Sequence, residues 1–218
     1  MTQKLKIDIV SDVVCPWCTI GYKRLEKAII ELGIQDKVDI EWQPFELNPN
    51  MPAEGQNVNE HITEKYGSTT EQQNESKQMM TEAGAELGFK FDYFDEMRMV
   101  NTFDAHVLLE YAKIFNKQTE LKMRLTASFF GERKDVSKRD VLKQALLEVG
   151  LNAEEGLAKL DIESARSEVR AKQDYWKNLG VNSVPTIVFN RKSAVTGAQP
   201  VDTFKQVLTE LMKEQSSL

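Results

Sequence analysis

Cys15 and Cys18 are the only cysteines of this chain of 218 residues, and Pro16 and Trp17 alone separate them. Two thiols at this spacing can react in turn with a disulfide. One attacks as a thiolate and forms a mixed disulfide, and the second then releases the bound partner by attacking the first. The spacing therefore indicates dithiol–disulfide exchange.

Three other roles for the pair fit the sequence less well. A structural disulfide across two residues closes a very short loop, which removes little entropy from the unfolded chain. A structural zinc site needs four ligands, and beyond the pair the chain has only His61 and His106, far apart in sequence. Covalent haem attachment requires histidine after the second cysteine, where Thr19 stands. We therefore expect no metal at this site.

A strand and a helix must position the pair. Residues 5–10 alternate apolar and polar side chains and predict a strand, and residues 25–32 have apolar side chains at helical spacing. Cys15 would then be the helix N-cap and Pro16 the first helical residue. The free backbone N–H groups of the first turn and the positive end of the helix dipole favour a thiolate at Cys15. We predict that Cys15 is the nucleophile and Cys18 the resolving thiol.

The remaining chain alternates between sheet and helical patterns. Residues 38–45 predict a second strand, parallel to the first, and the residues that follow to position 55 are too rich in Pro and Asn for regular structure. Between 59 and 161 we find no convincing strand, and Ser137 is one of several good helix caps. We interpret residues 71–78 as a solvated helical face. The predicted helices of this region span 70–87, 102–115, 119–130, 137–149 and 152–160.

A charged helix over 162–179 leads back to strands at 184–190 and 193–196 and to a closing helix over 201–213. The fold class is therefore α/β. We divide the chain into a discontinuous α/β domain and a helical insertion subdomain. The domain comprises residues 1–58 and 162–218, and the insertion comprises residues 59–161.

The order of these elements resembles a thioredoxin fold with an all-helical insertion, as in DsbA-like oxidoreductases, and it is most similar to FrnE-like members of the DsbA family. The motifs that carry the resemblance are spread over almost the whole chain. They are Ser11-Asp12 with Cys15-Pro16-Trp17-Cys18 and Gly21, Pro44-Phe45-Glu46-Leu47-Asn48-Pro49, Asn101-Thr102-Phe103-Asp104-Ala105-His106, Val184-Pro185-Thr186 and Gly197-Ala198-Gln199-Pro200.

The resemblance implies that Pro185 is cis and lies against the dithiol, and that Val184 offers backbone groups to an extended substrate. It also makes Phe45, Asn101 and His106 candidate substrate-binding residues. The chain departs from the family pattern after His106, where Val107 replaces an expected basic residue.

The residues around the cysteines bear on the redox poise and on proton transfer. DsbA has histidine where this chain has Trp17, and because Trp17 has no charge we expect a less oxidising couple here. Asp12 is either a proton relay to Cys18 or a local acceptor for backbone N–H groups in its turn, and turn preferences favour the acceptor. His106 is by default a packed, hydrogen-bonded histidine.

Composition limits the partners. The net charge of −6 and the pI near 5.2, without a basic patch, argue against a nucleic-acid partner. No apolar run reaches transmembrane length, and residues 1–4 lead into the first strand without a signal peptide pattern. We therefore expect no membrane partner and a cytoplasmic location, where disulfides are usually transient and catalytic.

The sequence thus predicts a cytosolic thiol–disulfide oxidoreductase, a protein disulfide reductase or isomerase that acts on protein or small-molecule disulfides and thiols. We expect no cofactor, because no second CxxC and no flavin or nicotinamide fingerprint is present. An external thiol pool or a thioredoxin-type partner must then recycle the pair. Two alternatives remain open. One is a glutathione-dependent isomerase or transferase, similar to the kappa class and 2-hydroxychromene-2-carboxylate isomerase, and the other is a non-catalytic holdase or binding module.

Overall fold

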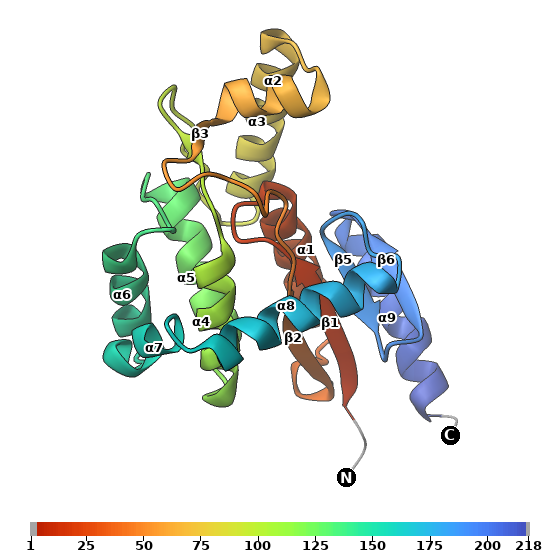
Figure 1. The fold of residues 1–218 in the computed structure, drawn as a ribbon. Helices are drawn as coiled ribbons and strands as arrows, with labels where there is room; N and C mark the ends of the chain where they lie inside the picture. Colours follow the sequence, from red (N-terminus) through yellow and green to blue (C-terminus); the bar gives the residue numbers. More distant parts are fainter. Residues whose placement is uncertain (1–3, 217–218) are drawn as a thin grey trace.

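The structure of the protein is a computed structural model, which describes residues 4–216 (Figure 1). A mixed sheet of four strands, in the order β2-β1-β5-β6, lies at the centre. β1 is parallel to β2 and antiparallel to β5, and β5 is antiparallel to β6. The strands are β1 (Leu5–Ser11), β2 (Val38–Pro44), β5 (Thr186–Phe189) and β6 (Ser193–Thr196).

Most of the helices lie between β2 and β5 in the sequence, and Figure 1 shows that α2 to α7 form a body beside and above the sheet. A 3-10 helix (Gln35–Lys37) precedes β2. The α-helices are α1 (Pro16–Glu31), α2 (Val58–Tyr66), α3 (Thr70–Glu86), α4 (Phe103–Ile114), α5 (Gln118–Gly131), α6 (Arg139–Glu148), α7 (Ala153–Lys159), α8 (Glu163–Asn178) and α9 (Val201–Ser216).

The sheet buries both of its faces because successive strand residues point to opposite sides. On one face, Ile7 and Ile9 belong to an apolar cluster that includes residues of α1 and α9, such as Leu25 and Phe204. On the other face, Val10 packs in a cluster with Trp176 of α8. The sheet is therefore the middle of three layers. Helices α1 and α9 cover one face, and α8 covers the other.

The helical body has its own apolar core, and this core extends to the loop before the cysteines. Val13 and Val14 are fully buried in the same cluster as Leu108 of α4 and Leu125 of α5. The loop that precedes the cysteines is thus held by the helical body as well as by the sheet. The predicted α/β architecture with a helical insertion is confirmed. In residues 4–216 no helix combines the length and apolar character needed to cross a bilayer.

Three details of the sequence analysis were wrong. A short strand, β4 (Arg98–Met99), lies in the region predicted to lack strands, where it pairs with β3 (Gln56–Asn57). Two residues are too few to show a strand period. The helix α2 was missed, although its N-cap Asn57 accepts from the N–H groups of two following residues. Ser137 is not a helix cap, since its hydroxyl donates to Asp135 and the helix begins two residues later.

Glu41 of β2 connects the sheet to the helical body through ion pairs with Lys6 of β1 and Lys113 of α4. Burial alone raises the pKa of Glu41, but hydrogen bonds from Lys113 and Lys6 lower it from 4.5 to about 2. A carboxylate with a depressed pKa in the folded state stabilises the fold at pH values above its ordinary pKa. This stabilisation is lost as the pH falls toward the folded value.

We therefore expect Glu41→Gln to lower the free energy of unfolding near pH 7 by on the order of 2 kcal/mol. The difference from the wild type should shrink between pH 4.5 and about 2, because the wild-type carboxylate becomes protonated there. Urea unfolding at several pH values measures both effects. Wild-type and variant stability curves that run parallel across this range would contradict the assignment.

Candidate functional site

Cys15 and Cys18 lie at the N-terminus of α1, as the sequence predicts. Cys15 is the N-cap with extended backbone angles (φ −99°, ψ 110°), and Pro16 is the first helical residue. Both cysteines are free thiols, 3.0 Å apart. The exposed fraction is 4% for Cys15 and 1% for Cys18. The two sulfurs are therefore placed to form a bond with each other, and Cys15 is the more accessible of the two.

The loop before β5 reaches the pair from the far end of the sequence. The peptide bond between Val184 and Pro185 is cis, which confirms what the family resemblance implied. The carbonyl oxygen of Val184 lies 4.0 Å from Sγ of Cys15. A Cβ atom at Gly21 of α1 would lie 3.1 Å from the Pro185 ring, so a side chain here would push against the ring and glycine eases the close approach. Residues 184–185 and the first turns of α1 thus form one surface.

The second thiol interacts electrostatically with a buried lysine. Desolvation raises the pKa of Cys18 well above its ordinary value, and the neighbouring Cys15 raises it further. Lys122 of α5 and a backbone hydrogen bond from Asp12 act in the opposite direction and favour the thiolate. Lys122 is 2% exposed, and its Nζ lies 5.1 Å from the centroid of the Trp42 ring. Among residues 4–216 this Nζ has no hydrogen-bond partner, so its charge remains available to the thiol.

Burial brings the pKa of the Lys122 ammonium below its ordinary value, although the negative charges of Cys18, Asp12 and Cys15 act in the opposite direction, in that order of size. A cation in an apolar interior is costly unless anions lie nearby. The ionised forms of Cys18 and Lys122 therefore stabilise each other.

Asp12 and His106 form a second buried pair. One carboxylate oxygen of Asp12 accepts the N–H of Val13 at 2.7 Å, and the other accepts the N–H of Leu47 at 2.8 Å. His106 Nε2 is 3.3 Å from the same carboxylate, a contact of ion-pair length without hydrogen-bond geometry. Burial raises the pKa of Asp12, but His106 and the backbone donor Leu47 bring it below its ordinary value. Asp12 is therefore an ionised acceptor that holds two loops together, the role that turn preferences favour.

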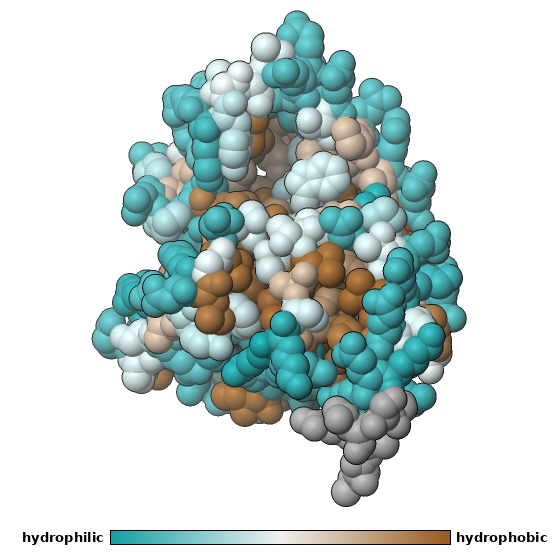
Figure 2. Space-filling model, turned by 90° about the vertical axis from the view of Figure 1, so that its right-hand side faces the viewer, coloured by the Kyte–Doolittle hydropathy of each residue, from teal (hydrophilic) through white to brown (hydrophobic). Residues whose placement is uncertain are grey.

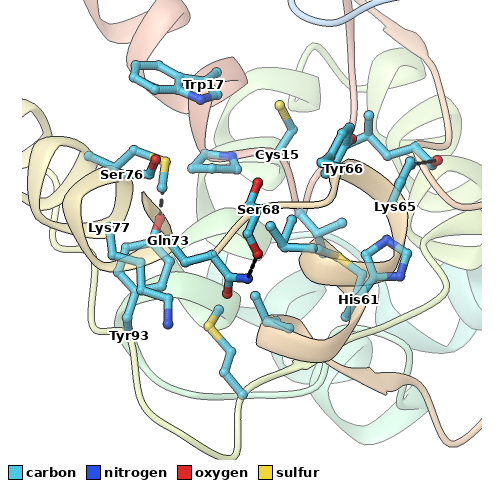
Figure 3. Close-up of a pocket in the computed structure, with 18 of the residues that line it drawn as sticks. Cys15, Trp17, His61, Lys65, Tyr66, Ser68, Gln73, Ser76, Lys77 and Tyr93 are labelled. Carbon is cyan, nitrogen blue, oxygen red and sulfur yellow. Dashed lines mark hydrogen bonds between the residues drawn. The ribbon is translucent and has the colours of Figure 1, made fainter. Parts of the chain in front are cut away.

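A pocket of about 310 Å³ opens in front of Cys15 (Figure 3). Cys15 and Trp17 of α1 form one side, and α2 and α3 form the other. Its apolar lining includes Tyr93 and Phe130. Figure 2 shows the surface hollowed below the hydrophilic helices at the top of the molecule, with hydrophobic residues inside the hollow. The pocket is large enough to admit a side chain or a small molecule to the first sulfur.

The structure brings together some of the predicted site residues and separates others. Cys15, Pro16, Trp17 and Val184 line the pocket, whereas Cys18, Pro185 and Asp12 are not among its lining residues. The three candidate substrate-binding residues are not part of the pocket lining. Phe45 packs against the sheet with Val10, Asn101 accepts the N–H of Phe103 at 2.9 Å, and His106 faces Asp12.

The lysines near the site were not predicted from the sequence. The position of Lys122 could have indicated its burial. It follows Leu121 and lies three residues before Leu125, and both leucines belong to the buried apolar face of the helix. Lys77 lies in the segment interpreted as a solvated face, yet it lines the pocket, and Gln73 in the same segment is buried. Gln73 donates to the hydroxyl of Thr63 at 2.8 Å, which ties α3 to α2. The polar composition of this segment concealed its contacts.

The sequence model of the family described as "DSBA-like thioredoxin domain" matches residues 6–209. The uncharacterized protein YwbO of Bacillus subtilis is 28% identical over 211 residues, which cover 96% of this chain and 98% of that protein. The crystal structure of a probable DsbA oxidoreductase from Streptomyces coelicolor, SCO1869, has a TM-score of 0.90 at 32% identity. The alignment covers 96% of this chain and 91% of that one.

Two more distant structures share the fold. A 2-hydroxychromene-2-carboxylate isomerase has a TM-score of 0.72 at 12% identity, covering 97% of this chain and 98% of that one. The cytosolic disulfide reductase DsbM of Pseudomonas aeruginosa, solved with glutathione, has a TM-score of 0.66 at 16% identity. The alignment covers 95% of this chain and 99% of that one. The same backbone arrangement thus occurs in proteins named for different reactions.

Proposed function

The chain belongs to the family of DsbA-like thioredoxin domains, and from this membership we propose that it is a thiol–disulfide oxidoreductase that works in the cytosol as a disulfide reductase or isomerase. The observation that carries the proposal is the pair itself. Cys15 and Cys18 are free thiols 3.0 Å apart, and the first of them lines the pocket. Proteins or small molecules that carry disulfides or thiols are the proposed substrates.

The reaction proceeds in two exchanges. The Cys15 thiolate attacks one sulfur of a substrate disulfide, forms a mixed disulfide and expels the other sulfur as a thiolate. Cys18 then loses its proton and attacks the Cys15 sulfur. This step closes the Cys15–Cys18 disulfide and releases the second substrate thiolate. The enzyme has lost two electrons and the substrate has gained them, so an external thiol pool or a thioredoxin-type partner must reduce the enzyme again.

The surroundings supply a role for each supporting residue. The helix N-terminus at Pro16 favours negative charge on Cys15, and the Val184 carbonyl beside this sulfur marks where an extended substrate backbone would lie. Trp17 is 36% exposed at the edge of the pocket, where it offers an apolar surface to the substrate. Pro185 positions the Val184 carbonyl, and Asp12 holds the loop before Cys15.

Two observations favour reduction or isomerisation over net oxidation. The residues between the cysteines are uncharged, so no cation in the dipeptide stabilises the reduced form as histidine does in DsbA. A similar fold is found in a protein named as a cytosolic disulfide reductase. In a reducing compartment the pair would rest mostly as the dithiol.

The two alternatives make different use of the pair. A glutathione-dependent isomerase of the 2-hydroxychromene-2-carboxylate type has a similar fold, but Cys18 beside Cys15 favours disulfide exchange. A holdase or binding module would use the pocket without turnover. It would protect client proteins equally well after both cysteines are changed to serine.

The test combines a redox titration with an activity assay. We expect equilibration with glutathione redox buffers to give a reduction potential more negative than that of DsbA, which is about −120 mV. We also expect the protein to catalyse the reduction of insulin disulfides, and Cys15→Ser to abolish this activity. A potential close to that of DsbA would overturn the proposed direction. Insulin reduction that persists in the Cys15→Ser variant would overturn the assignment to this pair.

A further inference from the structure

The pocket in front of Cys15 has an unusual charge composition for this protein. The chain contains 34 Asp and Glu residues against 28 Lys and Arg residues. Among the described residues that line the pocket, however, there are two lysines, Lys65 and Lys77, and neither aspartate nor glutamate. An acidic protein thus has a positively charged pocket directly beside its reactive sulfur, and such a pocket attracts anions.

Neutral oxygens hold both lysines in place. Nζ of Lys65 in α2 donates to the Leu47 carbonyl at 2.8 Å and to the side-chain oxygen of Asn48 at 2.7 Å. Nζ of Lys77 in α3 donates to the side-chain oxygen of Asn59 at 2.6 Å. Neither lysine forms an ion pair with a carboxylate in residues 4–216. Within the described residues, therefore, neither charge is neutralised by an ion pair.

Some other lysines of the chain have their charge compensated by a carboxylate. Lys6 and Lys113 share the carboxylate of Glu41, and Lys172 pairs with Glu110. Burial and the nearby Lys65 lower the pKa of His61, another pocket residue, which disfavours a positive charge on its ring. The positive charge of the pocket therefore comes from the two lysines. Figure 3 shows them on opposite sides of the space in front of Cys15.

The rest of the lining is apolar, and the volume is small. Met80, Tyr93 and Phe129 contribute to the interior of the pocket. A cavity of about 310 Å³ lies at the lower end of the range for small-molecule sites, which begins near 300 Å³. This size suits a whole small molecule better than a folded protein surface.

We propose that this pocket binds a low-molecular-weight thiol that carries carboxylates. Lys65 and Lys77 bind the carboxylates, and the sulfur of the ligand lies next to Cys15. The inference rests on the proposed function and names the chemical class of the external reductant. The thiolate of this molecule attacks Cys15 in the oxidised enzyme and breaks the Cys15–Cys18 bond, and Cys18 takes up a proton. A second molecule attacks the ligand sulfur of the mixed disulfide, which yields the small disulfide and frees Cys15. Two electrons pass from two thiols to the enzyme.

The test measures how fast three thiols reduce the oxidised wild-type protein. The probes are reduced glutathione, which has two carboxylates, neutral 2-mercaptoethanol and cationic cysteamine. Each second-order constant is divided by the fraction of the probe present as thiolate and corrected for the dependence of thiolate nucleophilicity on thiol pKa, with a Brønsted coefficient of about 0.4–0.5. We expect glutathione to react at least about tenfold faster than 2-mercaptoethanol, and cysteamine to react more slowly. The advantage of glutathione should shrink at high salt, because salt screens exposed charges.

Variants then assign this preference to the two lysines. In the double variant Lys65→Met with Lys77→Met, the ratio of the glutathione constant to the 2-mercaptoethanol constant should fall at least about tenfold. Lys143→Met, which removes an exposed charge on α6, is the matched control and should leave the ratio unchanged. Thermal unfolding reports whether each variant remains folded, and the salt dependence of the wild type tests the inference without any variant.

The outcomes separate this inference from the proposed function. Equal constants for glutathione and 2-mercaptoethanol in the wild type, or a ratio that stays unchanged in the folded double variant, would overturn the inference and leave the oxidoreductase proposal intact. If none of the three thiols reduces a Cys15–Cys18 disulfide, the proposed function itself fails and the inference fails with it.

Discussion

Replacing Cys18 by serine is expected to stop the reaction halfway and to leave a mixed disulfide on Cys15. The variant retains the accessible thiol at the helix N-terminus, but it lacks the buried thiol 3.0 Å away that would release the substrate. Steady-state disulfide reduction should therefore fall by about a thousandfold or more, as is usual when an essential reacting group is removed. Mass spectrometry of the variant after incubation with a disulfide substrate measures the adduct directly.

Cys15→Ser is the matched control for this experiment. It retains Cys18, which is 1% exposed and whose pKa is raised by burial, so we expect it to accumulate no adduct under the same conditions. An adduct that forms equally in both variants would show that the two thiols are interchangeable. This result would contradict the assigned roles.

The second large effect concerns Lys122, whose buried charge favours the thiolate of Cys18. We expect Lys122→Met to slow the release of mixed disulfides from Cys15 by about 10- to 100-fold near pH 7, because the variant loses the positive charge that favours the attacking thiolate of Cys18 and nearby charges interact by about 1 to 3 kcal/mol at an effective dielectric constant of about 20. Methionine has a similar length and no charge to desolvate, so the variant should fold. Quenched-flow measurement of adduct decay gives the rate.

The pH dependence separates this electrostatic role from a merely structural one. Loss of the positive charge raises the pKa of Cys18 further, so the release rate of Lys122→Met should rise with pH at higher pH values than that of the wild type. Lys143→Met on the surface of α6 serves as the control and should leave the profile unchanged. A reduced rate in Lys122→Met with the wild-type pH profile would indicate a packing defect instead.

The sequence predicted the parts of this site that depend on local order along the chain. The strand, the Cys15 N-cap and the Pro16 start of α1 follow from neighbouring residue types, and each is confirmed. The cis peptide before Pro185 came from the family resemblance, since an X–Pro dipeptide by itself does not reveal its isomer.

The parts that were missed depend on packing between distant segments. Lys122 and Lys77 lie on helices far from Cys15 in the sequence, and a single lysine on a helix resembles any solvated lysine until the opposing surface is known. Phe45 and His106, in contrast, were predicted as substrate-binding residues but do not line the pocket. Both occur in motifs that resemble the family, but the structure buries Phe45 against the sheet and His106 beside Asp12, outside the pocket lining.

The position of β5 in the central sheet has a consequence for how the chain acquires its structure during synthesis. β1 pairs with β5, although nearly all of the helices lie between them in the sequence. Such distant pairing gives a high contact order and favours slow completion of the sheet, whereas the helices of the insertion make mostly local contacts and form early. Cys15 and Cys18 are close in sequence and leave the ribosome together. Both thiols are therefore synthesised, and can form a bond with each other, before Val184 has been made, at a stage when the surroundings of Cys15 lack the Val184 carbonyl.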